Sequence, residues 1–248
     1  MAQYGRLADI YDYLVGSVDY NEWIDYIEAI VRKFGHQVRT VADLACGTGN
    51  TTLPFAQRGY RVVGIDLSGE MLDIARKKAE EEGSDADFLE QNMCELSLAE
   101  PVDLMTCYHD GLNYILEPGD LARVFRGVYE NLKPGGMFIF DLVNVQKLNR
   151  IHGGTSFVDD EKMSLVWETF YHQERDVWEI QLTGFIKKGD LYEKFQEVHR
   201  EKGYTTEEVM EMLTEAGLEL LDIYGAFTFI KAGDGTYRKF YVVRRQEQ

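Results

Sequence analysis

The chain has 248 residues, of which 45% are hydrophobic, and its formal net charge is −17. That length provides enough residues for a large buried core in one or two domains. The strong negative charge, together with the lack of any dense Lys/Arg run, argues against a nucleic acid as partner, because the phosphate backbone would meet a repulsive field.

Two amphipathic helices are predicted within residues 1–35, because apolar residues recur there at helical spacing. The first contains Tyr4 and Tyr11, and the second follows Asn21. Such apolar stripes usually pack on a core, but the first helix could instead form a lid whose tyrosines close over a bound ligand. The segment has acidic residues and no apolar signal-peptide core, and no run approaches the eighteen apolar residues of a membrane span. We therefore expect a cytoplasmic protein without a membrane segment.

A glycine turn follows a short buried strand that is predicted at residues 40–45. Gly47 and Gly49 allow the backbone to turn tightly and expose its N–H groups, and a helix predicted at 51–58 adds unpaired donors in its first turn. A carboxylate or phosphate can rest there. Asp66 ends a second apolar strand, where a carboxylate suits the two hydroxyls of a ribose. Two classes of cofactor, dinucleotides and S-adenosylmethionine (SAM), are bound by such an arrangement.

The dinucleotide fingerprint requires a third glycine, where this chain has Thr52, and it has no counterpart of Asp43. The string Asp-x-Ala-x-Gly-x-Gly at 43–49 instead resembles motif I of class I SAM-dependent methyltransferases. The later strings Val-Val-Gly-Ile-Asp-Leu-Ser at 62–68 and Leu-Lys-Pro-Gly-Gly at 132–136 extend this resemblance. The resemblance implies that SAM is the cofactor and that its binding residues include Asp43, Ala45, Gly47, Gly49, Asp66, Leu67 and Met71.

The string Tyr-x-x-Leu-Ala-x-x-Tyr-Asp at residues 4–12 resembles the N-terminal signature of a group of bacterial small-molecule methyltransferases. That group is related to the amino-sugar N,N-dimethyltransferases. Its N-terminal segment packs over the SAM site, which implies that Tyr4 and Tyr11 contact the cofactor.

From residue 40 to 143, predicted strands and helices alternate, which implies a parallel sheet that is covered by helices on both faces. The strands are predicted at 40–45, 61–66, 86–90, 102–107 and 136–142, and the helices at 51–58, 68–82 and 119–131. Asn92 and Met93 follow the third strand, where the family usually has an acidic residue that contacts the adenine amino group. The Asn92 oxygen can still accept this hydrogen bond, although an Asn in an ordinary turn is the alternative.

The fourth predicted strand ends at Cys107 and leads into a loop, Asp-Gly-Leu-Asn-Tyr, that resembles the family's acceptor-binding string Asp-Ser-Leu-Asn-Tyr. Ligands bind at this edge of an open parallel sheet. The resemblance implies that Cys107 lies at the cofactor and that Tyr108 and Asn113 lie at the acceptor. His109 is predicted as the general base, because a histidine near its ordinary pKa of about 6.5 is half in the basic form near neutrality. A structural histidine is the alternative, and His199 is the second candidate base.

After residue 144 the pattern changes to an antiparallel β-meander at 156–200, with extended segments at 163–172, 177–187 and 191–200. We predict that this meander walls the acceptor pocket and forms a homodimer interface. Its many aromatic residues could equally serve only to pack on the parallel sheet. A helix with a capping box and a closing β-hairpin are predicted over 205–248.

These patterns predict one α/β domain over residues 1–248, a Rossmann-like class I methyltransferase three-layer sandwich. Its mostly parallel seven-stranded sheet carries the antiparallel β-meander as an insertion. The parts are lid helices at 1–35, a SAM-binding core at 40–143, the meander at 156–200 and the closing helix and hairpin at 205–248. The predicted function is methyl transfer from SAM to N or O of a small-molecule acceptor.

Two other functions remain open. A non-catalytic SAM-binding protein would share every motif of the cofactor site, and a NAD-dependent oxidoreductase is disfavoured by Thr52. The three cysteines lack C-x-x-C spacing and lie in or beside apolar strands, so we expect buried thiols and no metal site.

Overall fold

The computed structural model describes residues 7–246, so the predicted cofactor contact of Tyr4 lies outside the described residues. The helices are α1 (Ala8–Leu14), α2 (Tyr20–Lys33), α3 (Thr52–Gln57), α4 (Gly69–Glu82), α5 (Pro118–Asn131), α6 (Val145–His152) and α7 (Thr206–Glu215), with 3-10 turns η1 (Met93–Glu95) and η2 (Gly111–Tyr114). The strands are β1 (Thr40–Leu44), β2 (Arg61–Asp66), β3 (Asp87–Glu90), β4 (Val102–Cys107), β5 (Leu132–Val143), β6 (Gly154–Asp159), β7 (Met163–His172), β8 (Val177–Lys188), β9 (Leu191–Lys202), β10 (Leu218–Gly225) and β11 (Arg238–Arg245). No helix in residues 7–246 has the length and apolar character needed to cross a membrane.

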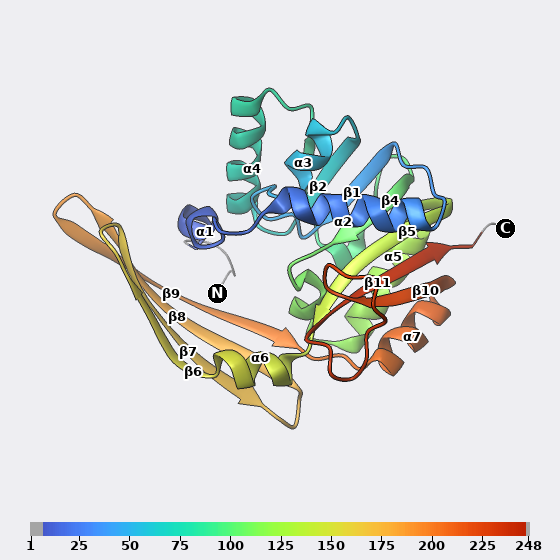
Figure 1. Cartoon of the computed structure of the whole chain (residues 1–248). Coiled ribbons are helices and arrows are strands. Elements are labelled where there is room, and N and C mark those ends of the chain that lie inside the picture. Colours follow the sequence, from blue (N-terminus) through green and yellow to red (C-terminus); the bar gives the residue numbers. More distant parts are fainter. Residues whose placement is uncertain (1–6, 247–248) are drawn as a thin grey trace.

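The main sheet has seven strands in the order β10-β11-β5-β4-β1-β2-β3 (Figure 1). The five strands from β5 to β3 are parallel, and β11 pairs antiparallel with both β5 and β10. The predicted Rossmann-like sheet and its closing hairpin are therefore confirmed. The central strands β1, β4 and β5 are largely buried along their length, as expected when helices cover both faces of a sheet, whereas the edge strand β3 is mostly exposed.

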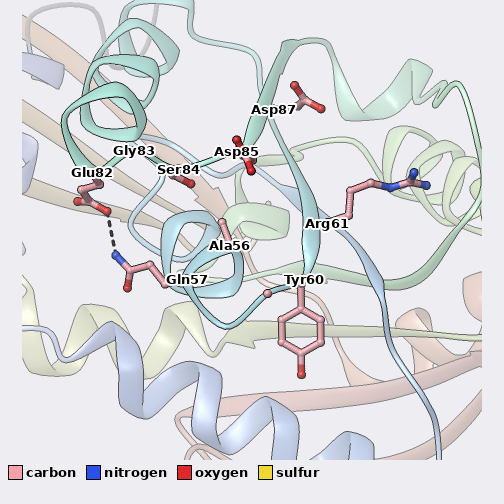
Figure 2. Close-up of a pocket in the computed structure, with 10 residues that line it drawn as sticks. Ala56, Gln57, Tyr60, Arg61, Glu82, Gly83, Ser84, Asp85 and Asp87 are labelled. Carbon is pink, nitrogen blue, oxygen red and sulfur yellow. Dashed lines mark hydrogen bonds between the residues drawn. The ribbon is translucent and has the colours of Figure 1, made fainter.

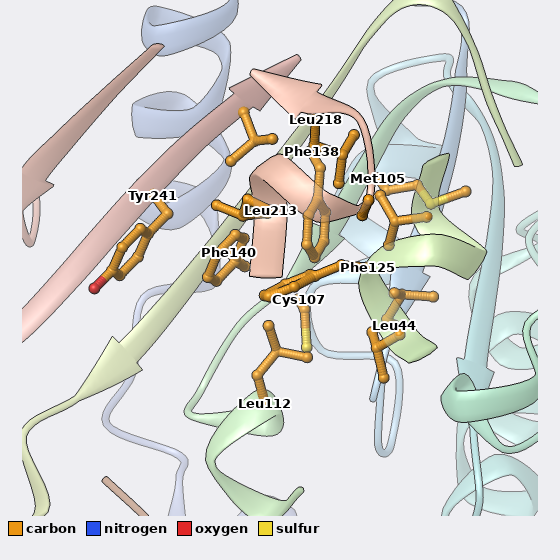
Figure 3. Close-up of a cluster of buried hydrophobic side chains, with 14 of the residues drawn as sticks. Leu44, Met105, Cys107, Leu112, Phe125, Phe138, Phe140, Leu213, Leu218 and Tyr241 are labelled. Carbon is orange, nitrogen blue, oxygen red and sulfur yellow. The ribbon is translucent and has the colours of Figure 1, made fainter. Parts of the chain in front are cut away.

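Two hydrophobic clusters hold the helices on the sheet. On one face, α5 and α7 pack over the stacked rings of Phe138, Phe140 and Tyr241, as Figure 3 shows. On the other face, α2 places Trp23 against Phe240 in a second cluster. Burial of one such large side chain contributes about 1.5–3 kcal/mol, so these clusters fix the strands whose ends carry the candidate site.

Local capping chemistry sets the beginnings of two predicted helices. The Ser68 hydroxyl accepts a hydrogen bond from the Met71 N–H at the start of α4. Thr205 and Glu208 form a complete capping box at the start of α7. Both helices therefore begin where the sequence predicted, because side-chain acceptors satisfy N–H groups that the first turn leaves unpaired.

The insertion is a separate antiparallel sheet of four strands, β6-β7-β8-β9, which projects from the main sheet (Figure 1). The sequence predicted three of them and missed β6, because all six β6 residues are exposed and show no apolar alternation. One face of this sheet packs on α1 through a cluster of Leu7, Ile10, Met163, Leu165, Leu182 and Phe195. Part of the meander's apolar surface therefore packs on α1 and not on the parallel sheet.

Candidate functional site

The glycine loop after β1 adopts the conformation that its residues allow. Gly47 and Gly49 have φ values of +55° and +79°, in the left-handed region that glycine tolerates best. A Cβ added to Gly49 would meet Ala75 and Phe88, whereas one added to Gly47 would meet no heavy atom within 4 Å. Gly49 is therefore required for packing, and Gly47 presents an open backbone surface to a ligand.

Asp66 ties the end of β2 to this loop. Its carboxylate accepts the Gly47 N–H at 2.8 Å and the Ser68 N–H at 2.8 Å. Burial raises the pKa of Asp66, and these two backbone hydrogen bonds oppose that rise. Each carboxylate oxygen keeps a second lone pair, so the group can still accept from ribose hydroxyls, and that predicted contact stays a prediction.

Asp43 supports the loop from inside the protein. Its side chain is 1% exposed and accepts hydrogen bonds from the hydroxyls of Thr51, Thr52 and Thr106 at 2.6–2.8 Å. These bonds give Asp43 a positioning role, and its predicted place among the cofactor-binding residues stays a prediction. Asp43 fixes the start of α3 against β1 and β4.

Other predicted cofactor residues fall into two groups. The side chains of Met71 and Cys107 are 2% and 0% exposed and lie in the packed interior, so their predicted places at the cofactor stay predictions. Leu67 is 69% exposed at the end of β2. Asn92 is exposed, but its oxygen caps η1 by accepting the Cys94 N–H at 3.0 Å, which leaves one lone pair for an adenine amino group.

Helix α1 lies against the glycine loop through a latch that the sequence analysis missed. The Asp12 carboxylate accepts from the Thr48 hydroxyl at 2.6 Å and the Asn50 amide at 2.8 Å, and it pairs with Lys78 at 2.9 Å. Burial would raise the pKa of Asp12, but these partners lower it overall. We call Asp12, Thr48, Asn50 and Lys78 the α1 latch.

The other side of α1 contacts the inserted sheet. The Leu7 N–H donates to Glu197 on β9 at 2.9 Å, and the Tyr13 hydroxyl donates to Asp160 at 2.7 Å. Between these contacts, Tyr11 is largely buried, and its pKa is raised by burial and then by the charges of nearby groups that include Asp110 and Asp66. Helix α1 therefore bridges the cofactor loop and the inserted sheet, as a lid over both would.

In the loop after β4, His109 is largely buried and not poised to titrate near neutral pH. His109 stacks on Trp23 with ring centroids 4.2 Å apart, and its Nε2 has no hydrogen-bond partner among residues 7–246. Burial lowers the pKa of His109 to about 4. The expectation that His109 titrates near pH 6.5 is therefore wrong, because Trp23 and the surrounding protein exclude the water that would stabilise the charged ring.

Tyr108 and Asn113 also point into the protein. Tyr108 is 3% exposed and packs beside Trp23 and Phe240. Asn113 is fully buried, and its amide bonds to the N–H and C=O of Val143 and to the C=O of Lys202. Both side chains therefore shape the loop from within, and their predicted places at the acceptor stay predictions.

A buried acidic cluster lies where this loop meets β5, β9 and β11. The Arg238 guanidinium forms ion pairs with Asp110 at 2.6 Å and with Asp141. Burial raises the pKa of Asp141 and also that of nearby Glu201. We define Asp110, Asp141, Glu201 and Arg238 as the buried acidic cluster. An acidic residue inside the apolar run of β5 was the one sequence signal that could have predicted it.

His199, the second candidate base, lies on the face of β9 that also carries Glu197 and Glu201. It is 3% exposed, its Nε2 is 3.1 Å from Glu197, and its ring meets Tyr114 edge-on. A role as base stays a prediction for His199.

A hollow of about 660 Å³ lies elsewhere on the molecule and is lined by residues that include Arg61, Glu82 and Asp87 (Figure 2). Arg61 and Asp87 are the first residues of β2 and β3, whereas Asp66 ends β2. The hollow therefore lies at the edge of the sheet opposite the glycine loop, and it is separate from the candidate site.

The fold and the loop geometry together define a class I methyltransferase, and comparison with known proteins gives the family directly. Residues 41–136 match the family described as "Methyltransferase domain". The chain is 33% identical to a protein of Geobacillus sp. (strain WCH70) that is named as a methyltransferase, over 98% of this chain and 99% of that one. It thus belongs to the SAM-dependent methyltransferases, and its cofactor is SAM.

Solved structures agree with this assignment. The crystal structure of a SAM-dependent methyltransferase from Clostridium acetobutylicum ATCC 824 has a TM-score of 0.87 and 32% identity, over 99% of this chain and 100% of that chain. A sugar N-methyltransferase from Streptoalloteichus sp. ATCC 53650 shares the fold, with a TM-score of 0.79, 20% identity and coverage of 96% and 92%. The oxidoreductase alternative is set aside by these relatives.

Proposed function

We propose that this methyltransferase transfers the methyl group of SAM to a nitrogen or oxygen atom of a small-molecule acceptor. The observation that carries the proposal is the shared edge of the sheet. Asp66 is the last residue of β2, and the loop that begins at Tyr108 follows β4; these two strands lie on either side of β1. Ligands of open parallel sheets bind at the carboxyl ends of the strands, so cofactor and acceptor can meet there.

The residues at this edge fit SAM. The open backbone surface at Gly47 lets a ligand approach closely, and the adjacent Asp66 carboxylate would accept from the ribose hydroxyls. We propose that Ala45 and Leu67 flank the cofactor, that Asn92 and Met93 contact the adenine and that Tyr11 covers it. SAM supplies an activated methyl group when bound, so the protein mainly has to align acceptor and donor.

The test is calorimetric titration of the protein with SAM and with NAD, followed by mass spectrometry of a metabolite extract incubated with protein and SAM. We expect SAM to bind and NAD not to, and one metabolite to gain a methyl group. Absence of SAM binding would refute the cofactor site. If SAM binds but no molecule in the extract gains a methyl group, the result would favour a non-catalytic SAM-binding protein.

Three further properties belong to the proposal. The net charge of −17 disfavours nucleic acid acceptors, and a structural relative is named as a sugar N-methyltransferase, which supports a small molecule. Exposed Phe157, Phe170 and Tyr192 on the inserted sheet support a homodimer, which sedimentation analysis tests.

The three free cysteines suit the reducing cytoplasm, and cell fractionation tests that location.

A further inference from the structure

Glu201 is a buried carboxyl group that the folded chain leaves unsatisfied. It lies on β9, its side chain is 3% exposed, and its Oε2 has no hydrogen-bond partner among residues 7–246. Buried polar atoms are nearly always paired, because an unpaired one loses its hydration without replacement. A buried unpaired carboxyl beside a candidate active site therefore points to a missing ligand.

The charges around Glu201 indicate the sign of that ligand. Asp110, Asp141 and Arg238 are its charged neighbours, and the Tyr237 phenol is also close. The single guanidinium already forms ion pairs with both aspartates. The buried acidic cluster therefore holds two more carboxyl groups than guanidinium groups, and a bound cation would reduce this excess of negative charge.

The cluster is reachable from the cofactor edge. The side chains of Asp110 and Arg238 are 22% and 18% exposed, whereas those of Asp141 and Glu201 are buried. The pKa of Tyr11 on α1 is raised by burial and then by the charges of groups that include Asp110 and Asp66, so Tyr11 is within electrostatic range of both the cluster and the predicted ribose position. His109 and Asp110 have φ values of +52° and +60°, a strained turn of the kind found at ligand sites.

We infer that Glu201 recognises the methyl acceptor and that this acceptor is an amine which arrives as an ammonium ion. The inference rests on the proposed function and selects nitrogen over oxygen. An ammonium ion supplies both the missing charge and the missing hydrogen-bond donor, whereas a hydroxyl supplies only the donor. Among residues 7–246, no three His, Cys, Asp or Glu side chains are arranged so that they could hold a metal ion, which favours an organic ammonium ion over a divalent metal.

The chemical step balances with the groups present. The ammonium gives one proton to the ionised Glu201 carboxylate and becomes a neutral amine with a free lone pair. That lone pair forms the new N–C bond while the C–S bond of the sulfonium breaks and its electron pair remains on sulfur. The methylated nitrogen ends as an ammonium ion, the sulfur as a neutral thioether, and the Glu201 proton passes to water. Glu201 thereby acts on the reacting nitrogen itself.

Carbon-13 NMR of protein labelled at the glutamate side-chain carboxyl tests recognition without knowledge of the natural acceptor. The Glu201→Gln variant identifies the Glu201 signal. Burial raises the pKa of Glu201, so in the free protein we expect this signal to titrate at a higher pH than those of exposed glutamates. Methylammonium chloride should move it to the ionised position, and potassium chloride should not. No movement with methylammonium, or movement with magnesium chloride instead, would overturn the inference.

Turnover provides the second test. Pairs of amines and alcohols with the same carbon skeleton are incubated with protein and SAM, and the thioether product is counted. We expect methylation of amines, a loss of about 10²–10⁴-fold in kcat/KM in Glu201→Gln, and unchanged SAM affinity. Glu168→Gln, on an exposed position of β7, removes the same charge and should behave as wild type. Turnover of alcohols alone, or equal kinetics in the two variants, would overturn the inference; loss of SAM binding would instead count against the proposed function.

Discussion

Replacing Asp12 by alanine should loosen α1 and weaken SAM binding. The change removes two hydrogen bonds to a charged acceptor, each worth about 1.5–3 kcal/mol, and one partly exposed ion pair worth about 0–1 kcal/mol. The Asp12 side chain is 40% exposed, so the lower values apply, and about 3 kcal/mol of docking free energy is lost. Since 1.4 kcal/mol corresponds to a factor of ten, the Kd for SAM should rise by up to about 100-fold if SAM requires the docked helix.

Calorimetry with SAM and hydrogen exchange of the α1 amides provide the two measurements. Tyr13→Phe is the matched control, because it removes one exposed hydrogen bond from the same helix and leaves the latch intact. We expect faster exchange and weaker binding in Asp12→Ala and near wild-type behaviour in Tyr13→Phe. Undiminished SAM affinity together with unchanged α1 exchange would refute the role assigned to the latch.

Three other variants test separate parts of the site. Asp66→Ala should weaken SAM binding by at least about 10-fold in calorimetry, since a charged acceptor bond is worth about 1.5–3 kcal/mol; equal affinity would remove the ribose assignment. His109→Gln should flatten the pH dependence of the unfolding free energy between pH 4 and 6.5. The folded-state pKa is lowered to about 4, so the unfolded chain binds more protons there and wild-type stability falls as the pH drops; an unchanged slope would contradict the burial argument. Asn113→Ala should lower stability by about 2–4 kcal/mol in urea unfolding, because it leaves buried backbone groups of Val143 and Lys202 unpaired, and a neutral substitution would contradict this.

The strands and helix starts of the main sheet could be predicted because their causes are local. A continuous apolar run such as 136–142 has few alternatives to a buried strand. Ser68 and Thr205 carry their capping acceptors within three residues of the N–H groups that they satisfy. The glycine loop likewise follows from residues adjacent in the chain. Such features need no knowledge of the tertiary structure.

The charged parts of the site could not be predicted because their partners are distant in sequence. Asp12 is an ordinary polar-face residue until Thr48, 36 positions away, is brought to it. Arg238 meets Asp141 across 97 positions. His109 was assigned its ordinary pKa, and only the packing of Trp23 over its ring shows why that value does not hold. Environment, not residue type, decides the chemistry of these groups.

The Asn113 amide has a consequence for the order in which the molecule assembles. Its hydrogen bonds reach the backbone of Val143, 30 residues downstream, and of Lys202, 89 residues downstream. Closing such long loops is slow, and during synthesis the earlier part of the chain emerges first. A nascent chain can therefore form the strands around Gly47 and Asp66 while the loop after β4 still lacks its last anchor. During synthesis, the nascent chain should therefore become able to bind SAM before it becomes able to transfer the methyl group.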